Sequence, residues 1–363
     1  MKSNLVESWD EFYRLEGEWN TLLSSSASDS IFLTWEWVAA WVEIHKSKHK
    51  PFIVVTRDDN GSLIGLAPFY LSKMTVFKYI NLQCLRILGD ADTGAEYPDF
   101  IVQKTVADVA LYELIDILFL HHRQWDLVWM PNMSGWAGNA RQIRAVCLQK
   151  KIGHQQRENT FSSFSLIGDL QTFLSAFSRK HREQIRRQSK KILSGSVVER
   201  GQTCEEVAEY LDSLFSLHNK RRRQLHEQGI FEKRPDMKAF YQRFVPVAMN
   251  KGWLSIFRLN EQGQTRAVQL GYVYNNIFHQ MQEGFDPDFA AGAGNTLRLE
   301  VINNCFKDKI NEYDFLGGFT EHKRRWQARE RAGYDILIAG HNWIAKLIIK
   351  LGIWPTGRFM KVK

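Results

Sequence analysis

Residues 285–303 read FDPDFAAGAGNTLRLEVIN and place two glycines, Gly292 and Gly294, directly before a run with helical periodicity. The hydrophobic residues that recur at helical spacing are Leu297, Val301 and Cys305. This spacing predicts a helix that starts near Asn295. The first amides of a helix lack intrahelical acceptors, and glycines let an anion approach the backbone. The stretch therefore predicts a phosphate-binding loop, with an ordinary turn as the alternative.

The composition fits a globular protein with room for two hydrophobic cores. The chain has 363 residues, of which 44% are hydrophobic and 24% are charged. We expect no secretory signal and no transmembrane helix, because no apolar run has the required length. Four scattered cysteines lack the spacing of metal ligands, and so do the histidines, so we expect a reducing cytoplasm and no metal.

Positive charge is concentrated in three segments of a chain whose formal net charge is +8. These segments are residues 179–191, 220–223 and 322–331. Such clusters suit nucleic acid, anionic lipid or a phosphorylated small molecule. A solvated helix face is the alternative for the first of them. No nucleic-acid-binding module is recognisable, so nucleic acid is the least favoured partner.

The second half of the chain predicts an antiparallel meander that leads through the glycine loop into a helix. Alternating hydrophobic runs are separated by two short turns. A proline at the start of the preceding helix suits its first turn. The predicted elements are helices at 205–225 and 235–251, strands at 253–259, 265–274 and 277–283, a helix from Asn295, and a strand at 312–316.

The first half repeats this order in a weaker form. Its predicted elements are strands at 51–57, 62–71 and 97–102, a helix at about 105–122, and a strand at 125–130. The repetition predicts an α+β fold with a duplicated unit, of which only the second copy has the glycine loop. We expect a first domain over 1–160, a second over 161–338, and a basic amphipathic tail over 339–363.

This arrangement resembles the acyl-CoA-binding core of the GNAT acyltransferase superfamily, whose loop reads Gln/Arg-x-x-Gly-x-Gly/Ala. Here residues 289–294 read FAAGAG, so both glycines match and Phe289 stands at the first position. The resemblance implies that the loop amides hold the pyrophosphate of acetyl-CoA or another acyl-CoA. The implied cofactor-binding residues are Ala291, Gly292, Ala293, Gly294, Asn295 and Lys323.

More of the chain is similar to one branch, the GNAT-domain proteins grouped as cellulose- or exopolysaccharide-biosynthesis acyltransferases, which are relatives of the Fem-type aminoacyltransferases. The similar segments are 30–43, 63–70, 97–102, 179–193, 217–222, 229–231, 284–297 and 313–326. The resemblance implies two tandem GNAT-like units, with each sheet mixed and mostly antiparallel. It also implies N- or O-acyl transfer to a small-molecule, glycan or lipid-linked acceptor of the cell envelope. His322 stands where the branch usually has a tyrosine before the lysine.

Transfer of an acyl group from a thioester needs a base near the acceptor and a proton for the thiolate. Glu283 ends the strand expected beside the pantetheine arm, and Asp286 follows within three residues. Either carboxylate can act as the base, with capping or ion pairing as the alternative. His322 is the candidate proton donor, with an ordinary surface histidine as the alternative. Asp314 faces opposite to Tyr313 on its strand and is expected to line the acceptor cleft.

Three other functions stay open at this point. A Fem-type transferase would take its donor from aminoacyl-tRNA, which would explain the positive charge, although the glycine loop favours CoA. A non-catalytic GNAT-fold partner of polysaccharide synthesis would fit the changes at Phe289 and His322. A nucleic-acid-binding protein would use the basic segments 179–191 and 220–223.

The last segment, residues 340–363, predicts a basic amphipathic helix. Trp343, Leu347, Leu351 and Trp354 share one of its faces. Such a helix binds an anionic membrane interface, and a terminal helix docked on the protein is the alternative. We therefore expect a cytoplasmic protein with peripheral contact at the inner face of the membrane.

Overall fold

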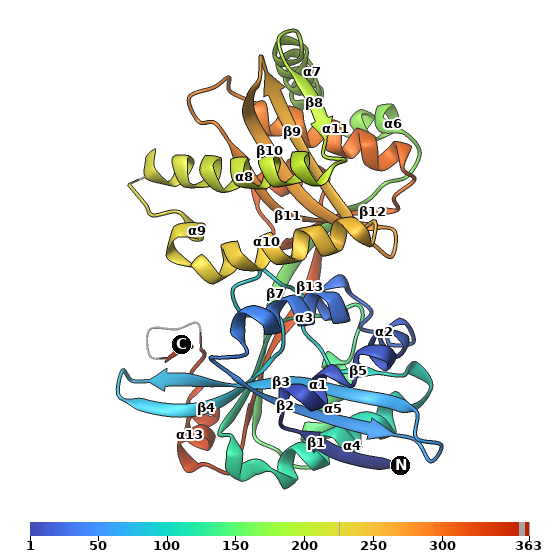
Figure 1. Ribbon diagram of the computed structural model, residues 1–363, viewed down its shortest axis with the longest axis vertical. Coiled ribbons are helices and arrows are strands. Elements are labelled where there is room, and N and C mark those ends of the chain that lie inside the picture. Colours follow the sequence, from blue (N-terminus) through green and yellow to red (C-terminus); the bar gives the residue numbers. More distant parts are fainter. Residues whose placement is uncertain (225, 356–359, 363) are drawn as a thin grey trace. The chain divides into compact units, whose positions relative to one another are not determined.

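The computed structural model describes residues 1–224, 226–355 and 360–362 (Figure 1). The chain divides into two compact units, one of residues Met1–Thr160 with Ala332–Lys363 and the other of Phe161–Arg331. Both units combine a sheet with flanking helices, which confirms the predicted α+β fold. The chain returns to the first unit after residue 331, so the segment expected to form a separate tail from 339 is grouped with that unit.

The sheet of the first unit runs in the order β1-β2-β3-β4-β6-β13-β7, and β5 and β14 pair with β3. Its strands are β1 (Lys2–Val6), β2 (Lys50–Arg57), β3 (Leu63–Val76), β4 (Ile80–Ile87), β5 (Ile101–Val102), β6 (Leu127–Ser134), β7 (His154–Ser165), β13 (Arg329–Ala339) and β14 (Met360–Val362). Its α-helices are α1 (Trp9–Tyr13), α2 (Glu16–Ser24), α3 (Trp35–His45), α4 (Ala107–Leu120), α5 (Ala140–Gln149) and α13 (Trp343–Leu351). Residue pairs 84–127 and 85–128 join β4 and β6 as parallel neighbours.

The strand predicted over 97–102 is wrong for most of its length, because only Ile101–Val102 form β5. Tyr97 has a φ of 60°, in the left-handed region, which ends any extended run there. The carboxylate of Asp99 accepts the backbone amides of Phe100 and Asn139, each at 2.7 Å. Local side-chain bonds therefore replace the strand ladder in this segment.

The sheet of the second unit runs in the order β7-β12-β11-β10-β9-β8. Its further strands are β8 (Val197–Arg200), β9 (Leu254–Glu261), β10 (Gln264–Tyr274), β11 (Ile277–Phe285) and β12 (Glu312–Gly317). Its helices are α6 (Leu170–Ser175), α7 (Arg179–Leu193), α8 (Cys204–Gln224), α9 (Ile230–Lys233), α10 (Pro235–Asn250), α11 (Ala293–Lys307) and α12 (Glu321–Arg325). The antiparallel meander predicted from the sequence is confirmed as β9, β10 and β11.

Helices cover both faces of this second sheet, and Figure 1 shows α8 and α10 in front of the meander and α11 behind it. Leu297 and Val301 of α11 are buried, as their helical spacing predicts. They belong to a hydrophobic cluster with Phe278 of β11 and Ile185 of α7. The core thus fixes α11, and with it the glycine loop, against the sheet.

The parallel strands β11 and β12 separate after a short pairing. They pair only at residues 277–279 of β11 with 312–314 of β12. Gln280 and Glu283 lie beyond this pairing, where β11 has β10 as its only sheet neighbour among the described residues. The side chains of Gln280 and Glu283 both reach Arg298 of α11.

Candidate functional site

The glycine loop is built so that two backbone amides are left free. Gly292 is the N-cap of α11 and has a φ of 99°, which a side chain rarely tolerates. A Cβ atom on Gly292 would lie 2.8 Å from the Gln188 side chain, whereas one on Gly294 would lie 3.4 Å from the Phe285 ring. In the described part of the chain, the amides of Gly294 and Asn295 have no hydrogen-bond acceptor. They can therefore receive an anion.

This loop forms one wall of a pocket with a volume of about 340 Å³. The same pocket is lined by Glu283, Arg298 and His322, and by Arg221 of α8. The volume is in the range of small-molecule sites. The residues that the sequence nominated and the pocket brings together are Glu283, Asp286, Ala291, Gly292, Ala293, Gly294, Asn295 and His322.

Arg298 lies at the centre of this site, although it was not among the residues expected from the sequence. Its side chain is 2% exposed and forms an ion pair with Glu283, which is 27% exposed. The guanidinium also lies 2.7 Å from Nε2 of His322. It donates to Gln280 at 3.4 Å and to Asn295 at 3.3 Å. A buried arginine is tolerated only with such partners, because burial of an unpaired charge is costly.

Aromatic rings enclose the same guanidinium. The centre of the Arg298 guanidinium lies 5.4 Å from the Trp326 ring and 5.8 Å from the Phe315 ring. Trp326 is fully buried and packs against this cation. One signal in the sequence pointed to Arg298: it lies one turn before Ile302, on the buried side of the helix.

His322 lies in the first turn of α12, and its ring reaches back to Arg298. Partial burial of the ring, and then the positive charge of Arg298, lower the pKa of His322. The imidazole is therefore neutral at pH 7, and Nε2 accepts a hydrogen bond from Arg298. We assign the proton to Nδ1 from this bond. His322 thus offers one N–H group rather than an imidazolium.

The buried phenol of Tyr313 orients the polar side chains at the base of the pocket. Tyr313 donates to Oε1 of Gln280 at 2.6 Å and accepts from Gln269 at 2.6 Å. Burial raises the pKa of Tyr313 well above its ordinary value, so the phenol stays protonated. Gln280 then donates to Glu283 at 3.3 Å. The chain from Gln269 to Glu283 therefore orients the carboxylate.

Asp286 lines the pocket but is engaged by two cations. It forms ion pairs with Lys220 and with Arg266, the latter at 2.9 Å. Burial opposes ionisation of Asp286, yet the hydrogen bonds from Lys220, Asp288 and Arg266 lower its pKa. The carboxylate therefore ties α8 and β10 to the start of the glycine loop.

Asp314 and Lys323 are not among the residues that line this pocket. Asp314 is buried, accepts the amide of Leu316 at 2.8 Å, and lies 3.4 Å from Nδ1 of His279. The Lys323 ammonium donates to the carbonyl groups of Phe315 and Gly318, each at 2.9 Å. It caps the end of β12, where Leu316 has a φ of 60°.

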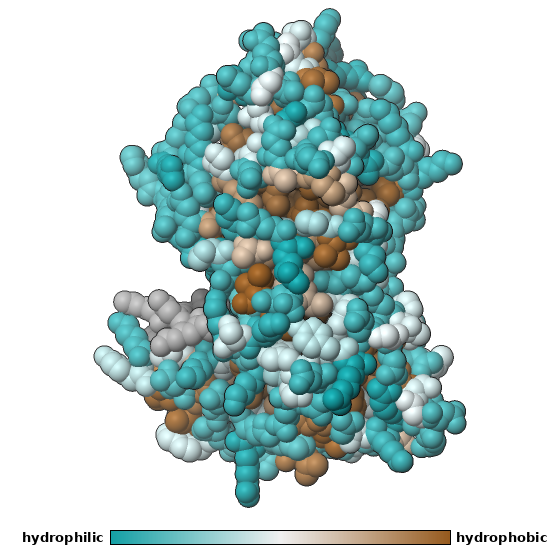
Figure 2. Space-filling view, in the orientation of Figure 1, coloured by the Kyte–Doolittle hydropathy of each residue, from teal (hydrophilic) through white to brown (hydrophobic). Residues whose placement is uncertain are grey.

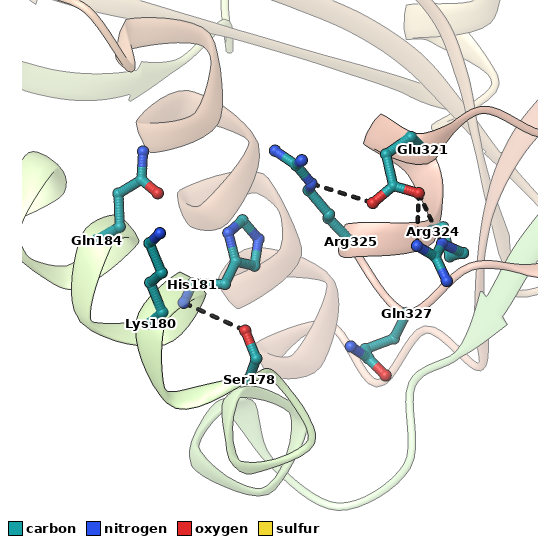
Figure 3. A pocket seen from close by; sticks show the side chains of 8 residues that line it. All are labelled: Ser178, Lys180, His181, Gln184, Glu321, Arg324, Arg325 and Gln327. Atoms are coloured by element: carbon teal, nitrogen blue, oxygen red, sulfur yellow. Dashed lines mark hydrogen bonds and ion pairs between the residues drawn. The ribbon is translucent and has the colours of Figure 1, made fainter.

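A second, basic pocket of about 630 Å³ lies in the same unit, between the start of α7 and α12 (Figure 3). Its cations are Lys180 of α7 and the α12 residues Arg324 and Arg325. Figure 3 shows both arginines pointing at Glu321, with ion pairs of 2.7 and 3.3 Å. The single Glu321 carboxylate therefore balances only part of this positive charge. Most other cations of α7 are exposed, because the helix buries Ile185 and Ile192.

The two α+β units have a GNAT-like fold, and comparisons with known proteins agree on that fold. Residues 179–324 match the profile of a family described as "Acetyltransferase (GNAT) domain". FemX has a similar structure, with a TM-score of 0.64 and 11% identity, over 96% of this chain and 100% of FemX. A search of curated proteins gave no significant match.

Two further solved structures share the fold at low identity. The C-terminal domain of a putative lysylphosphatidylglycerol synthetase from Agrobacterium fabrum gives a TM-score of 0.54 at 10% identity, over 93% of this chain and 95% of that one. L-PGS from Bacillus licheniformis gives 0.53 at 10% identity, over 92% and 96%. The profile match over residues 179–324 supports an acyltransferase domain in the second unit, and the solved structures support the fold alone.

Proposed function

We propose that the second unit transfers an acyl group directly from acyl-CoA, with acetyl-CoA as the first candidate donor, to an amine or hydroxyl group. One observation carries this proposal. One pocket is lined by Gly294 and Asn295, whose amides have no recorded acceptor among the described residues, and by Glu283. An anion-binding loop beside a candidate base is what a phosphate-bearing donor and a protic acceptor require.

The loop amides are proposed to hold the donor pyrophosphate, with Arg221 as a nearby cation. Arg221 lines the pocket and lies over the Phe285 ring, 4.4 Å from its centre. The side chain of Phe289 has no hydrogen-bond donor, so the backbone amides of the loop must provide the phosphate contact. Gly294 can be substituted without backbone strain, because its φ is not in the left-handed region. This makes it the best position for a test.

In the proposed reaction, Glu283 accepts the proton of the acceptor as its nitrogen or oxygen attacks the thioester carbonyl. This attack forms the new C–N or C–O bond, and the C–S bond then breaks to release the thiolate. The thiolate takes its proton from water, and Nδ1–H of the neutral His322 can donate a hydrogen bond to the sulfur without giving up its proton. Arg298 pairs with the Glu283 carboxylate, and Gln280 fixes its orientation. No covalent intermediate on the protein is needed.

The acceptor is proposed from the resemblance to exopolysaccharide-biosynthesis acyltransferases. It is a sugar, an amino sugar or a lipid-linked glycan of the cell envelope. The test is release of free thiol from acetyl-CoA with a panel of such acceptors, comparing the wild-type protein with Glu283→Gln. Acceptor-dependent release that is lost in the variant supports the proposal. A folded protein that turns over no acyl-CoA with any acceptor would favour a non-catalytic partner.

A second candidate donor is aminoacyl-tRNA, and one observation favours it. The exposed cations of α7 and the basic pocket of Figure 3 lie in the same unit as the glycine loop. Such a surface predicts RNA binding that weakens steeply with salt. The likeness to FemX establishes the fold alone. Binding of tRNA with no binding of any acyl-CoA would select this alternative.

A further inference from the structure

The C-terminal helix α13 has two apolar faces, and only one of them is covered. Ala345 and Ile348 are buried in a cluster formed by β3, β4, β6 and β13 of the first unit. On the other side, Trp343 is 72% exposed, Leu347 39% and Leu351 59%. Docking of α13 on the first unit therefore leaves uncovered three of the four residues that the sequence placed on one amphipathic face.

The tip of the β3–β4 hairpin adds a second group of exposed aromatic residues close to this helix. Val76 at the end of β3 belongs to the cluster that buries Ala345, and Ile80 at the start of β4 packs against it. Between them, Phe77 is 40% exposed and Tyr79 86% exposed. Figure 2 shows hydrophobic side chains at the surface in the region where Figure 1 draws this hairpin and α13.

This hairpin tip carries its aromatic residue at a conformational cost. Phe77 and Lys78 have φ values of 48° and 67°, which favour glycine or asparagine. The β10–β11 hairpin of the second unit makes its turn with Asn275 and Asn276 at 49° and 60°. The turn therefore holds an aromatic residue and a lysine where glycine or asparagine would cost less.

Lysines border both apolar groups. Lys346 and Lys350 lie beside the exposed stripe of α13 and are themselves exposed, and Lys78 lies at the hairpin tip. Aromatic and aliphatic side chains rimmed by lysines match the interface of an anionic bilayer, where rings settle at the headgroups and cations meet phosphate. None of the described helices combines the length and apolar character needed to cross a bilayer.

We propose that the first unit binds the surface of anionic membranes through this docking surface, defined as Phe77, Lys78, Tyr79, Trp343, Lys346, Leu347, Lys350 and Leu351. The proposal is independent of the reaction in the second unit. It gives a route by which a transferase could be held near acceptors at the cell envelope.

The test is co-sedimentation of the full chain with vesicles of phosphatidylcholine alone or with added phosphatidylglycerol. We expect binding only to the anionic vesicles. The variant Trp343→Ser/Leu347→Ser/Leu351→Ser should reduce the partition coefficient at least about tenfold. Neutralising Lys346 and Lys350 with glutamine should reduce it roughly fivefold for each lysine. A Tyr79→Ser variant should weaken binding without changing α13.

A matched control is Leu148→Ser on α5, because Leu148 is 56% exposed but lies outside the proposed surface. It should bind vesicles as the wild type does. Thermal unfolding should show that all variants remain folded, since the substituted side chains are exposed. The proposal is overturned if the triple variant binds anionic vesicles as well as the wild type, which would assign binding to the cations of the second unit. It is also overturned if the wild type forms a dimer that the triple variant loses.

Discussion

The guanidinium of Arg298 and the carboxylate of Glu283 form an ion pair in which the arginine is 2% exposed and the glutamate 27% exposed. The pair joins the glycine-loop helix α11 to the strand β11. The open side of Glu283 faces the pocket that the loop also lines. The pair therefore couples the integrity of the second unit to the chemistry proposed for it.

Replacement of Arg298 by methionine should damage stability and activity together. It leaves Glu283 without its cation and Nε2 of His322 without a donor. Loss of one partner of a buried pair costs about 3–5 kcal/mol, so the free energy of unfolding should fall by that order. Urea denaturation would measure this fall. A change below about 1 kcal/mol would show that the pair contributes little.

Glu283→Gln should separate chemistry from folding. Glutamine keeps an acceptor for Arg298 but cannot take a proton, so we expect kcat to fall by about 10²–10⁴ while donor affinity changes little. The matched variant is Asp286→Asn. In the wild type, Lys220 and Arg266 form ion pairs with the Asp286 carboxylate. It should lower the unfolding free energy more than it lowers kcat. Equal losses of kcat in the two variants would argue against Glu283 as the base.

The variant Lys323→Met tests whether Lys323 stabilises the end of β12 or binds the acyl-CoA donor. The resemblance to GNAT proteins places Lys323 among the cofactor-binding residues, whereas its ammonium donates to backbone carbonyl groups at the end of β12. We expect a loss of about 1–3 kcal/mol in unfolding free energy with the donor dissociation constant unchanged. Arg324→Met is the control, because Arg324 is 66% exposed and should cost less than about 0.5 kcal/mol. Weaker binding of the donor by Lys323→Met, but not by Arg324→Met, would show that Lys323 contacts the donor.

Acid should destabilise the protein through its partly buried histidines. Burial lowers the pKa of His49 and His218 below the ordinary value of 6.5. Below pH 6.5 the unfolded chain binds more protons at these residues than the folded chain, so their contribution to stability falls as the pH falls. Asp99 acts in the opposite direction, because burial raises its pKa to about 7.

The measurement is therefore a comparison of variants. The unfolding free energy should be followed from pH 7.5 to 5.5 for the wild type and for His49→Gln/His218→Gln. The variant should lose less stability on acidification than the wild type. An equal or greater loss in the variant would exclude these two histidines as the cause.

Much of the fold follows from periodicity in the sequence, because its elements are local. The meander β9–β11 and helices α8, α10 and α11 lie within a few residues of their predicted bounds. The strands β7 and β13 were not predicted. Each crosses the boundary between the units, and β13 joins the first unit by pairing with β6, about 200 residues earlier in the chain. Pairing over such a separation leaves no local pattern.

The sequence nominated residues of this pocket where backbone geometry leaves a local signal. Gly292 belongs to such a signal, because only glycine suits its left-handed φ beside Gln188. Glu283 was nominated from its place at the end of a strand, and it lines the same pocket. The ion pair of Arg298 depends on contacts between α11, β11 and α12, which no local spacing reports. The docked face of α13 was likewise hidden, because both of its faces are apolar.

The most direct test of the central claim is calorimetric titration of the purified protein with acetyl-CoA, for the wild type, Gly294→Ala and Gly294→Val. A Cβ atom at Gly294 makes only an ordinary contact with Phe285, so both variants should fold. We predict saturable binding to the wild type, retained binding in the alanine variant, and a loss of affinity of more than about tenfold in the valine variant, whose branched side chain crowds the free amides. Absence of binding to folded wild-type protein, or equal affinity in all three proteins, would contradict the account.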